Sequence, residues 1–106
     1  MAFDPLPPSW IASWSEDGTD VTFPIASIPE LTAAEADAAA GDIRNVLFAM
    51  LTELYSVWAA QDSADQPDNM TMTKSVSTNT TTNVSIQTFT VRFNTEVLTQ
   101  EVVAEA

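Results

Sequence analysis

Apolar residues recur at intervals of three and four between Leu31 and Ala60, which is the longest periodic stretch of the chain. This spacing puts side chains on one face of a helix. Thr32 and Glu35 form a T-x-x-E capping box, in which each side chain binds a backbone N–H of the first helical turn. Leu31 precedes the cap, so we predict a helix of about 28 residues within 31–60, roughly 40 Å long.

The predicted helix has two parts with Gly41 between them. Residues 33–40 are rich in alanine, whereas residues 43–58 are strongly apolar. Gly41 marks either a bend or a place where another backbone passes closely. A stripe this wide usually packs in a core, but the length of the helix is also compatible with a subunit interface. The interface candidates on it are Met50, Leu54 and Trp58.

From Met70 onward the apolar period changes to two, which is typical of β-strands. The polar residues 78–83 separate two such runs, so we predict an antiparallel hairpin that pairs 70–77 with 84–94. The apolar phase flips near Gln87 and Thr88, which predicts a β-bulge or bend there.

The threonine-rich hairpin would have open edges, which proteins usually protect or pair with another chain. Lys74 and Arg92 are candidates for that protection, and pairing of sheets between subunits is the alternative. Residues 97–103 are a candidate for a further short strand.

The first 14 residues contain Pro5, Pro7 and Pro8 and predict an extended arm, because proline lacks an N–H and favours extended conformations. The arm is too apolar to lie in water, so it either folds back on its own domain or lies across a neighbouring subunit. Its interface candidates are Phe3, Leu6, Trp10, Ile11 and Trp14. An Asp17-Gly18 turn signal then predicts a small hairpin.

Together these elements predict an α+β fold, in which one long amphipathic helix packs on a small antiparallel sheet. The sheet consists of the C-terminal hairpin and short N-terminal strands. The expected division is an extended arm over 1–14 and a single domain over 15–106.

Charge and composition exclude several classes of function. The chain has 15 acidic and three basic residues, a net charge of −12, so direct nucleic-acid binding and attachment to an anionic membrane are disfavoured. It has no histidine and no cysteine, which removes the usual general base, the thiolate nucleophile and the commonest metal ligands. With two glycines, no phosphate-binding loop is present. We expect no catalysis, no cofactor and no metal site.

The sequence shows neither a signal peptide nor an apolar run of membrane-spanning length. We therefore expect the protein in a virion or in the cytoplasm.

The apolar arm, the long helix and the open-edged hairpin each offer a surface for protein–protein contacts. This acidic, histidine- and cysteine-free layout, with threonine-rich strands and a terminal arm, resembles small accessory proteins of tailed-phage virions, such as capsid cement or decoration proteins. The resemblance implies a homo-oligomer seated on a capsid or shell lattice, with the arm in contact with neighbours.

Two other functions compete with that of a structural assembly protein. One is an acidic inhibitor that imitates nucleic acid and blocks a DNA-binding protein, which would require carboxylates along one exposed face. The other is a small adaptor domain that presents its helix to a partner.

Overall fold

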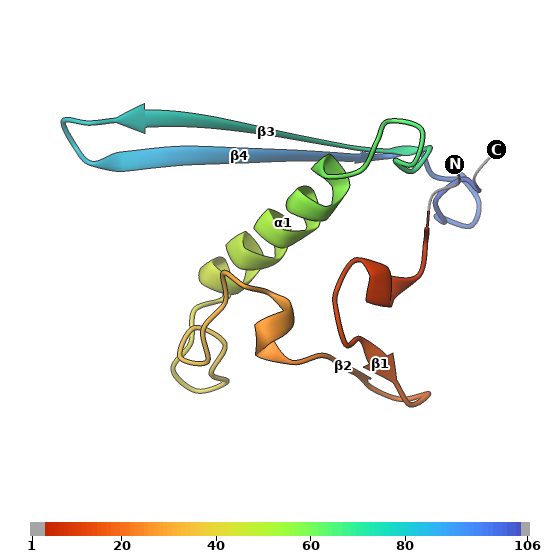
Figure 1. Cartoon of the computed structure of the whole chain (residues 1–106), viewed down its shortest axis with the longest axis horizontal. Coiled ribbons are helices and arrows are strands. Elements are labelled where there is room, and N and C mark those ends of the chain that lie inside the picture. Colours follow the sequence, from red (N-terminus) through yellow and green to blue (C-terminus); the bar gives the residue numbers. More distant parts are fainter. Residues whose placement is uncertain (1–3, 105–106) are drawn as a thin grey trace. The chain divides into compact units, whose positions relative to one another are not determined.

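The structure is a computed structural model that describes residues 4–104. Within these residues it contains one long helix and two antiparallel two-stranded sheets, which confirms the α+β fold (Figure 1). The chain divides into two compact units, Met1–Asp65 and Gln66–Ala106, and each is described by itself. A single domain over 15–106 stays a prediction.

The helix α1 spans Ile43–Ala59 and is shorter than the predicted helix over 31–60. Asp42 is its N-cap, because the Asp42 carboxylate accepts a hydrogen bond of 2.9 Å from the backbone N–H of Arg44. The predicted capping box does form, since the Thr32 and Glu35 side chains each bind the other's backbone N–H. It caps a single turn, however, and no helix continues from it.

The chain folds back on itself around Gly41, which explains why the helix starts late. The Gly41 N–H donates to the Asp37 carbonyl and the Asp42 N–H to the Glu35 carbonyl, at 2.8 and 3.1 Å. A Cβ atom on Gly41 would lie 2.6 Å from the Asp37 carbonyl oxygen and closer still to that of Glu35. Both sequence-based alternatives are observed, because the chain bends at Gly41 and the backbone of residues 35–37 passes close to it.

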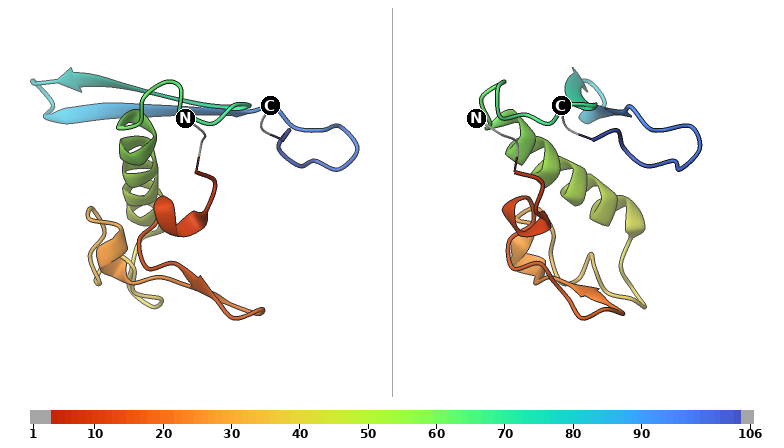
Figure 2. Two further views of the ribbon diagram at one scale, coloured as in Figure 1. Left: turned by 45° about the vertical axis from the view of Figure 1, so that its right-hand side comes forward. Right: turned by 90° about the vertical axis from the view of Figure 1, so that its right-hand side faces the viewer.

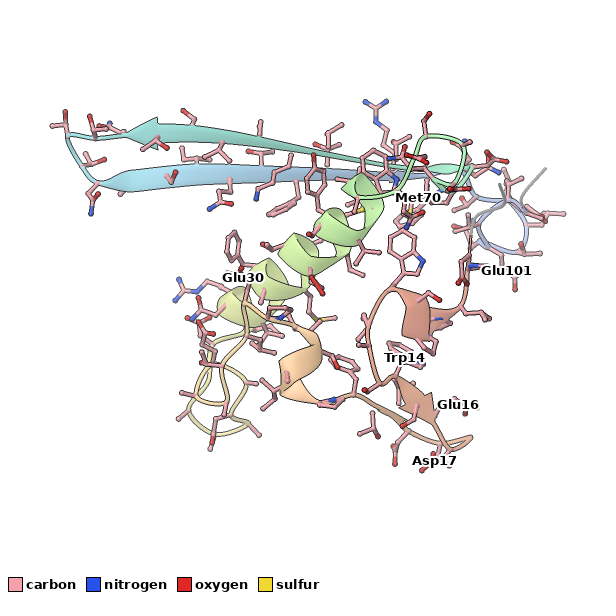
Figure 3. The ribbon with its side chains drawn as sticks, viewed as in Figure 1. Trp14, Glu16, Asp17, Glu30, Met70 and Glu101 are labelled. Atoms are coloured by element: carbon pink, nitrogen blue, oxygen red, sulfur yellow. The ribbon has the colours of Figure 1, made fainter. Side chains whose placement is uncertain are left out.

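Two very short strands, β1 (Ser15–Glu16) and β2 (Val21–Thr22), form the predicted small hairpin. Gly18 has a φ of +90° in the connecting turn, a conformation that favours glycine. The Asp17 carboxylate accepts hydrogen bonds from the backbone N–H groups of Thr19 and Asp20, which fix the turn. Figure 3 shows Glu16 and Asp17 at this end of the unit.

The core of the first unit consists of Ile11, Ile28 and Ala49, from the arm, the segment after β2 and the helix. Ile28 is fully buried, and burying such a side chain is worth about 1.5–3 kcal/mol. The partly buried residues around this core are Trp14, Phe23, Leu31, Met50 and Leu54. The helix therefore packs on residues that flank the small N-terminal sheet.

The arm is less extended than predicted. Pro7–Ser9 form a 3-10 turn, η1, and a second 3-10 turn, η2, spans Ile25–Ser27. The buried Ser27 hydroxyl donates to the Ala12 carbonyl, so the end of the arm is bound to η2. Among the described residues, the arm thus folds back on its own unit.

The second unit is built on a hairpin of β3 (Met70–Asn79) and β4 (Val84–Phe93). Every residue of one strand pairs with one residue of the other, from Met70 opposite Phe93 to Asn79 opposite Val84. The predicted bulge near Gln87 is therefore absent. Figures 1 and 2 show the two strands side by side along their whole length.

The segment after β4 returns to the start of β3 instead of forming the predicted strand over 97–103. An isolated bridge joins Thr95 to Val102. The Asn69 side chain donates to the Val103 carbonyl at 3.2 Å, and the Asn94 side chain donates to the Asn69 side-chain oxygen at 3.1 Å. These bonds close residues 95–102 into a loop beyond the end of the hairpin (Figure 2).

Candidate interaction surfaces

The β3–β4 hairpin is a two-stranded sheet, and among residues 4–104 no third strand joins it. Both β3 and β4 are therefore edge strands along ten residues each. Edge strands of this length, without proline, glycine or a bulge, are templates for pairing with another chain. In the second unit, the backbone itself is thus a candidate binding surface.

The continuous register places the apolar residues of β4 on opposite faces of the hairpin. Phe89, Val91 and Phe93 share one face, because side chains alternate along a strand. Val84 and Ile86 lie on the other face, and Ile86 is 63% exposed. The phase flip in the sequence therefore marks a change of face within an unbroken ladder. Met72 on the first face is buried, so the exposed apolar residues of the hairpin are Val76 and Phe93 on that face and Val84 and Ile86 on the other.

The hairpin is also the basic part of an acidic protein. Residues 70–93 contain Lys74 and Arg92 and no acidic residue, whereas the rest of the chain carries all 15 acids and Arg44. The Lys74 ammonium lies 5.3 Å from the centre of the Phe89 ring on the opposite strand, within the range of a cation–π contact. The charge of Lys74 is thus directed across the hairpin toward β4.

The loop over residues 95–102 presents two apolar side chains, Val97 and Leu98, which are 85% and 96% exposed. Hydrogen bonds hold its backbone: the Glu96 N–H donates to the Glu101 carbonyl, and the Gln100 side chain donates to the Val97 carbonyl, both at 2.8 Å. Figure 3 shows Glu101 on this loop. A defined loop that exposes Leu98 is a second candidate contact surface.

A hollow of about 210 Å³ lies at the base of the hairpin. It is smaller than the usual 300–1,000 Å³ of small-molecule sites. Its lining residues are Asn69, Met70, Thr71, Arg92 and Asn94. Arg92 is its single charged residue, and the asparagines take part in the bonds that close the loop, so the hollow is better explained as part of the loop anchor.

Four of the interface candidates of the first unit lie in its core or pack against it. Ile11 belongs to the core, and Trp14, Met50 and Leu54 pack against it, so the structure brings these four together. Trp14 also stacks on Phe23, with ring centroids 5.8 Å apart and planes 9° from parallel. Figure 3 shows Trp14 beside β1.

The remaining candidates lie apart from that cluster. Trp10 is half-buried, and its indole N–H donates to the Asp4 carbonyl at 2.9 Å. Trp58 is half-buried, with its ring centre 6.0 Å from that of Tyr55. Leu6 is 62% exposed, and Phe3 lies outside the described residues. Leu6 is therefore the residue of the described arm that best suits a contact with another molecule.

The sequence pattern did not identify Val97 and Leu98 as surface residues, because an apolar pair that follows a strand also fits the pattern of a further strand. The signal that could have identified the loop is the pair of matching residues Asn69 and Asn94, which flank the hairpin symmetrically. The Asn94 side chain binds that of Asn69, which in turn binds the backbone carbonyl of Val103.

The carboxylates of the first unit stabilise local structure. The Ser9 hydroxyl lowers the pKa of Asp4, and the backbone N–H of Asp20 lowers that of Asp17. The Arg44 side chain, 2.7 Å from Asp42, lowers the pKa of that carboxyl from 3.8 to about 2. Among residues 4–104 no three acids gather in the way a metal ion requires.

Comparison of the chain with protein-family profiles, curated proteins and solved structures gave no match. In the part of the chain that the structure describes, no helix combines the length and apolar character needed to cross a membrane.

Proposed function

We propose that the protein is a non-enzymatic assembly protein that acts by self-association and by contacts with other proteins. The observation that carries this proposal is the β3–β4 hairpin, whose strands pair with each other and with no other strand among residues 4–104. An isolated two-stranded hairpin is marginally stable in water, and further strands or packing are needed to stabilise it. An intermolecular contact would supply them.

The exposed apolar residues support the same proposal. Leu98 on the loop, Ile86 on the hairpin and Leu6 on the arm each expose more than 60% of their surface. Single exposed apolar side chains are common. Three separate elements with such residues, together with open strand edges, favour a protein that contacts more than one neighbour.

The partner we propose is a capsid or shell lattice, on which a homo-oligomer of this chain would act as a cement or decoration protein. The net charge of −12 suits a lattice surface with basic residues. The exposed Leu6 would contact a neighbour through the arm, and the hairpin would join copies to one another.

The acidic mimic of nucleic acid ranks second. It would need carboxylates arrayed on one exposed face, but α1 carries a single acid, Glu53. Most of the other acids of the first unit lie in turns and irregular segments between residues 4 and 42 and between 62 and 65. This distribution does not favour the mimic, which stays a prediction, as does the adaptor.

The test is the native mass of the full chain at near-physiological salt over a range of concentrations. We expect a defined oligomer. A monomer at every concentration would contradict self-association and favour the adaptor.

The full-chain variant Leu6→Asp distinguishes the role of the arm, with Thr19→Asp, at an exposed residue of the turn between β1 and β2, as its control. If the arm contacts a neighbouring copy, Leu6→Asp should shift the distribution toward smaller species and Thr19→Asp should not. An equal effect of both changes would point to added charge instead.

A further inference from the structure

The outer edge of β3 has a defined set of backbone groups available for pairing. The Asn94 N–H donates to the Asn69 carbonyl at 2.8 Å, and these residues continue the register of the hairpin. Because hydrogen-bonded and non-hydrogen-bonded pairs alternate in an antiparallel ladder, the residues of β3 with odd numbers point their N–H and C=O groups toward β4. The even-numbered residues, including Lys74, Val76 and Thr78, point these groups outward.

A second observation supports this assignment. The Thr78 and Ser85 hydroxyls lie 2.8 Å apart across the hairpin. Side chains are closest in non-hydrogen-bonded pairs, so Thr78 belongs to such a pair and its backbone groups point away from β4. The outer edge of β3 thus presents backbone donors and acceptors on every second residue.

From this edge we infer that two copies of the chain join β3 to β3 in antiparallel orientation, with Val76 of one copy opposite Val76 of the other. The result is a continuous four-stranded sheet in the order β4-β3-β3-β4. The inference rests on the proposed self-association and names the contact through which it occurs.

Charge favours a second copy as the occupant of this edge. Two chains of net charge −12 repel each other over most of their surfaces. Residues 70–93 contain no carboxylate, so this hairpin is where two copies approach with the least repulsion between acids. A two-fold contact also has to be self-complementary, and a strand edge rich in serine and threonine meets that requirement.

The position of Lys74 leaves the outer edge of β3 unprotected and disfavours one register. Lysine commonly protects a strand edge, but the Lys74 ammonium lies over the Phe89 ring of β4 and is directed away from the outer edge of β3. Like charges directly opposite each other are destabilising, which disfavours a two-fold axis at Lys74.

With the axis at Val76, each Lys74 faces Thr78 of the other copy. The two Val76 side chains then meet on one face of the sheet, and Ser75 faces Ser77 on the other face. Hydroxyl pairs and apolar pairs of this kind stabilise antiparallel sheets.

Cysteine cross-linking tests this register, because the chain has no cysteine of its own. In Val76→Cys the two introduced thiols would be directly opposite, with Cα atoms about 5.5 Å apart, which is within the range of a disulfide. Val84→Cys is the matched control, since Val76 and Val84 are both 54% exposed and Val84 lies on the outer strand of the proposed sheet.

We expect a disulfide-linked dimer from Val76→Cys under mild oxidation and none from Val84→Cys. Linkage of both variants to the same extent, or of Val84→Cys alone, would overturn the inference. If native mass shows an oligomer but Val76→Cys does not cross-link, this contact is wrong while the proposed function stands. If native mass shows a monomer throughout, the proposed function fails as well.

A pair of proline variants tests the edge without cysteine. Val76 and Gln87 are opposite each other in the hairpin, and the N–H of each points outward. Proline at either position leaves the β3–β4 bonds in place and removes one donor from one edge. We expect Val76→Pro to weaken the dimer by about tenfold or more and Gln87→Pro to leave it unchanged. An equal loss in both variants, with strand content retained by circular dichroism, would contradict the choice of β3.

Discussion

The two units of the chain use apolar residues in opposite ways. In the first unit, residues distant in sequence converge on Ile28, which is fully buried. In the second, Val76 and Ile86 lie on opposite faces of a ribbon and both remain largely exposed. The difference arises from periodicity, because a helical stripe collects its side chains on one side, whereas a strand whose apolar phase flips divides them between two faces. The first unit thus closes a core, whereas the second, in which Met72 is the one buried residue among those described, mainly presents apolar side chains at its surface.

The sharpest test of this contrast replaces one isoleucine in each unit. Ile28→Ala removes a fully buried side chain and should cost about 2–5 kcal/mol of the free energy of unfolding. Ile86→Ala, at a residue 63% exposed, should change the stability of the isolated chain by less than about 0.5 kcal/mol. Urea denaturation of both variants provides the measurement. Equal losses would show that Ile86 is as tightly packed as Ile28.

The second prediction concerns Gly41, at the boundary between the folded-back segment and α1. A Cβ at this position meets the Glu35 and Asp37 carbonyl oxygens, so Gly41→Ala should destabilise the protein by about 1–3 kcal/mol. A continuous helix over 31–60 would instead gain about 1 kcal/mol from the same change. Thermal unfolding and helical circular dichroism together distinguish the two.

Gly18→Ala serves as the control for that substitution. Gly18 has a positive φ, but no atom would contact an added Cβ, so the cost should be limited to about 1–2 kcal/mol of backbone strain. A rise in helicity for Gly41→Ala, absent for Gly18→Ala, would show that the long helix is the better description.

A smaller effect is expected from the cap of α1. The Arg44 side chain lowers the pKa of Asp42 to about 2, so this carboxylate contributes stability above its ordinary pKa of 3.8. That contribution is lost as the pH falls through about 2. Asp42→Asn keeps a capping oxygen but removes the charge, so the difference in Tm between wild type and variant should shrink between these two pH values. A constant difference would show that the Asp42–Arg44 pair does not stabilise the first unit.

The smallest effect on the isolated chain is expected for Leu98→Asp. Leu98 is 96% exposed, and surface substitutions usually change stability by less than about 0.5 kcal/mol. If the loop contacts a partner, the same variant should weaken assembly measured by native mass. A large loss of stability in the monomer would show that Leu98 packs within its own chain.

The sequence predicted the kinds of elements better than their limits. The helix, both hairpins and the Asp17-Gly18 turn are confirmed, because their signals are local periodicity and turn chemistry. The capping box at Thr32 predicts a helix start there. However, such a box satisfies N–H groups in a single turn as well as in a long helix, so it does not distinguish the two. Asp42 directly precedes the first apolar residue of the stripe and also satisfies the N-cap rule, but two valid caps cannot be ranked without knowing that the backbone turns at Gly41.

The candidate surfaces were predicted in part. Open edges of the hairpin followed from its threonine-rich strands, but the flip of apolar phase allows either a bulge or a change of face. The choice depends on the pairing of the opposite strand, from Met70 to Asn79, which one strand's pattern does not specify. The burial of Ile11 was likewise not predictable, because its contacts with Ile28 and Ala49 join residues far apart in the chain.

The placement of Trp14 and the other tryptophans in the first unit has a practical consequence. Trp10, Trp14 and Trp58 and the single tyrosine, Tyr55, all lie within residues 1–65, and the second unit contains neither residue type. Tryptophan emission is therefore an intrinsic optical label for one half of the molecule. If copies assemble with an unchanged tryptophan emission spectrum but a changed amide circular dichroism signal, the contact between them lies in residues 66–106, which contain neither tryptophan nor tyrosine.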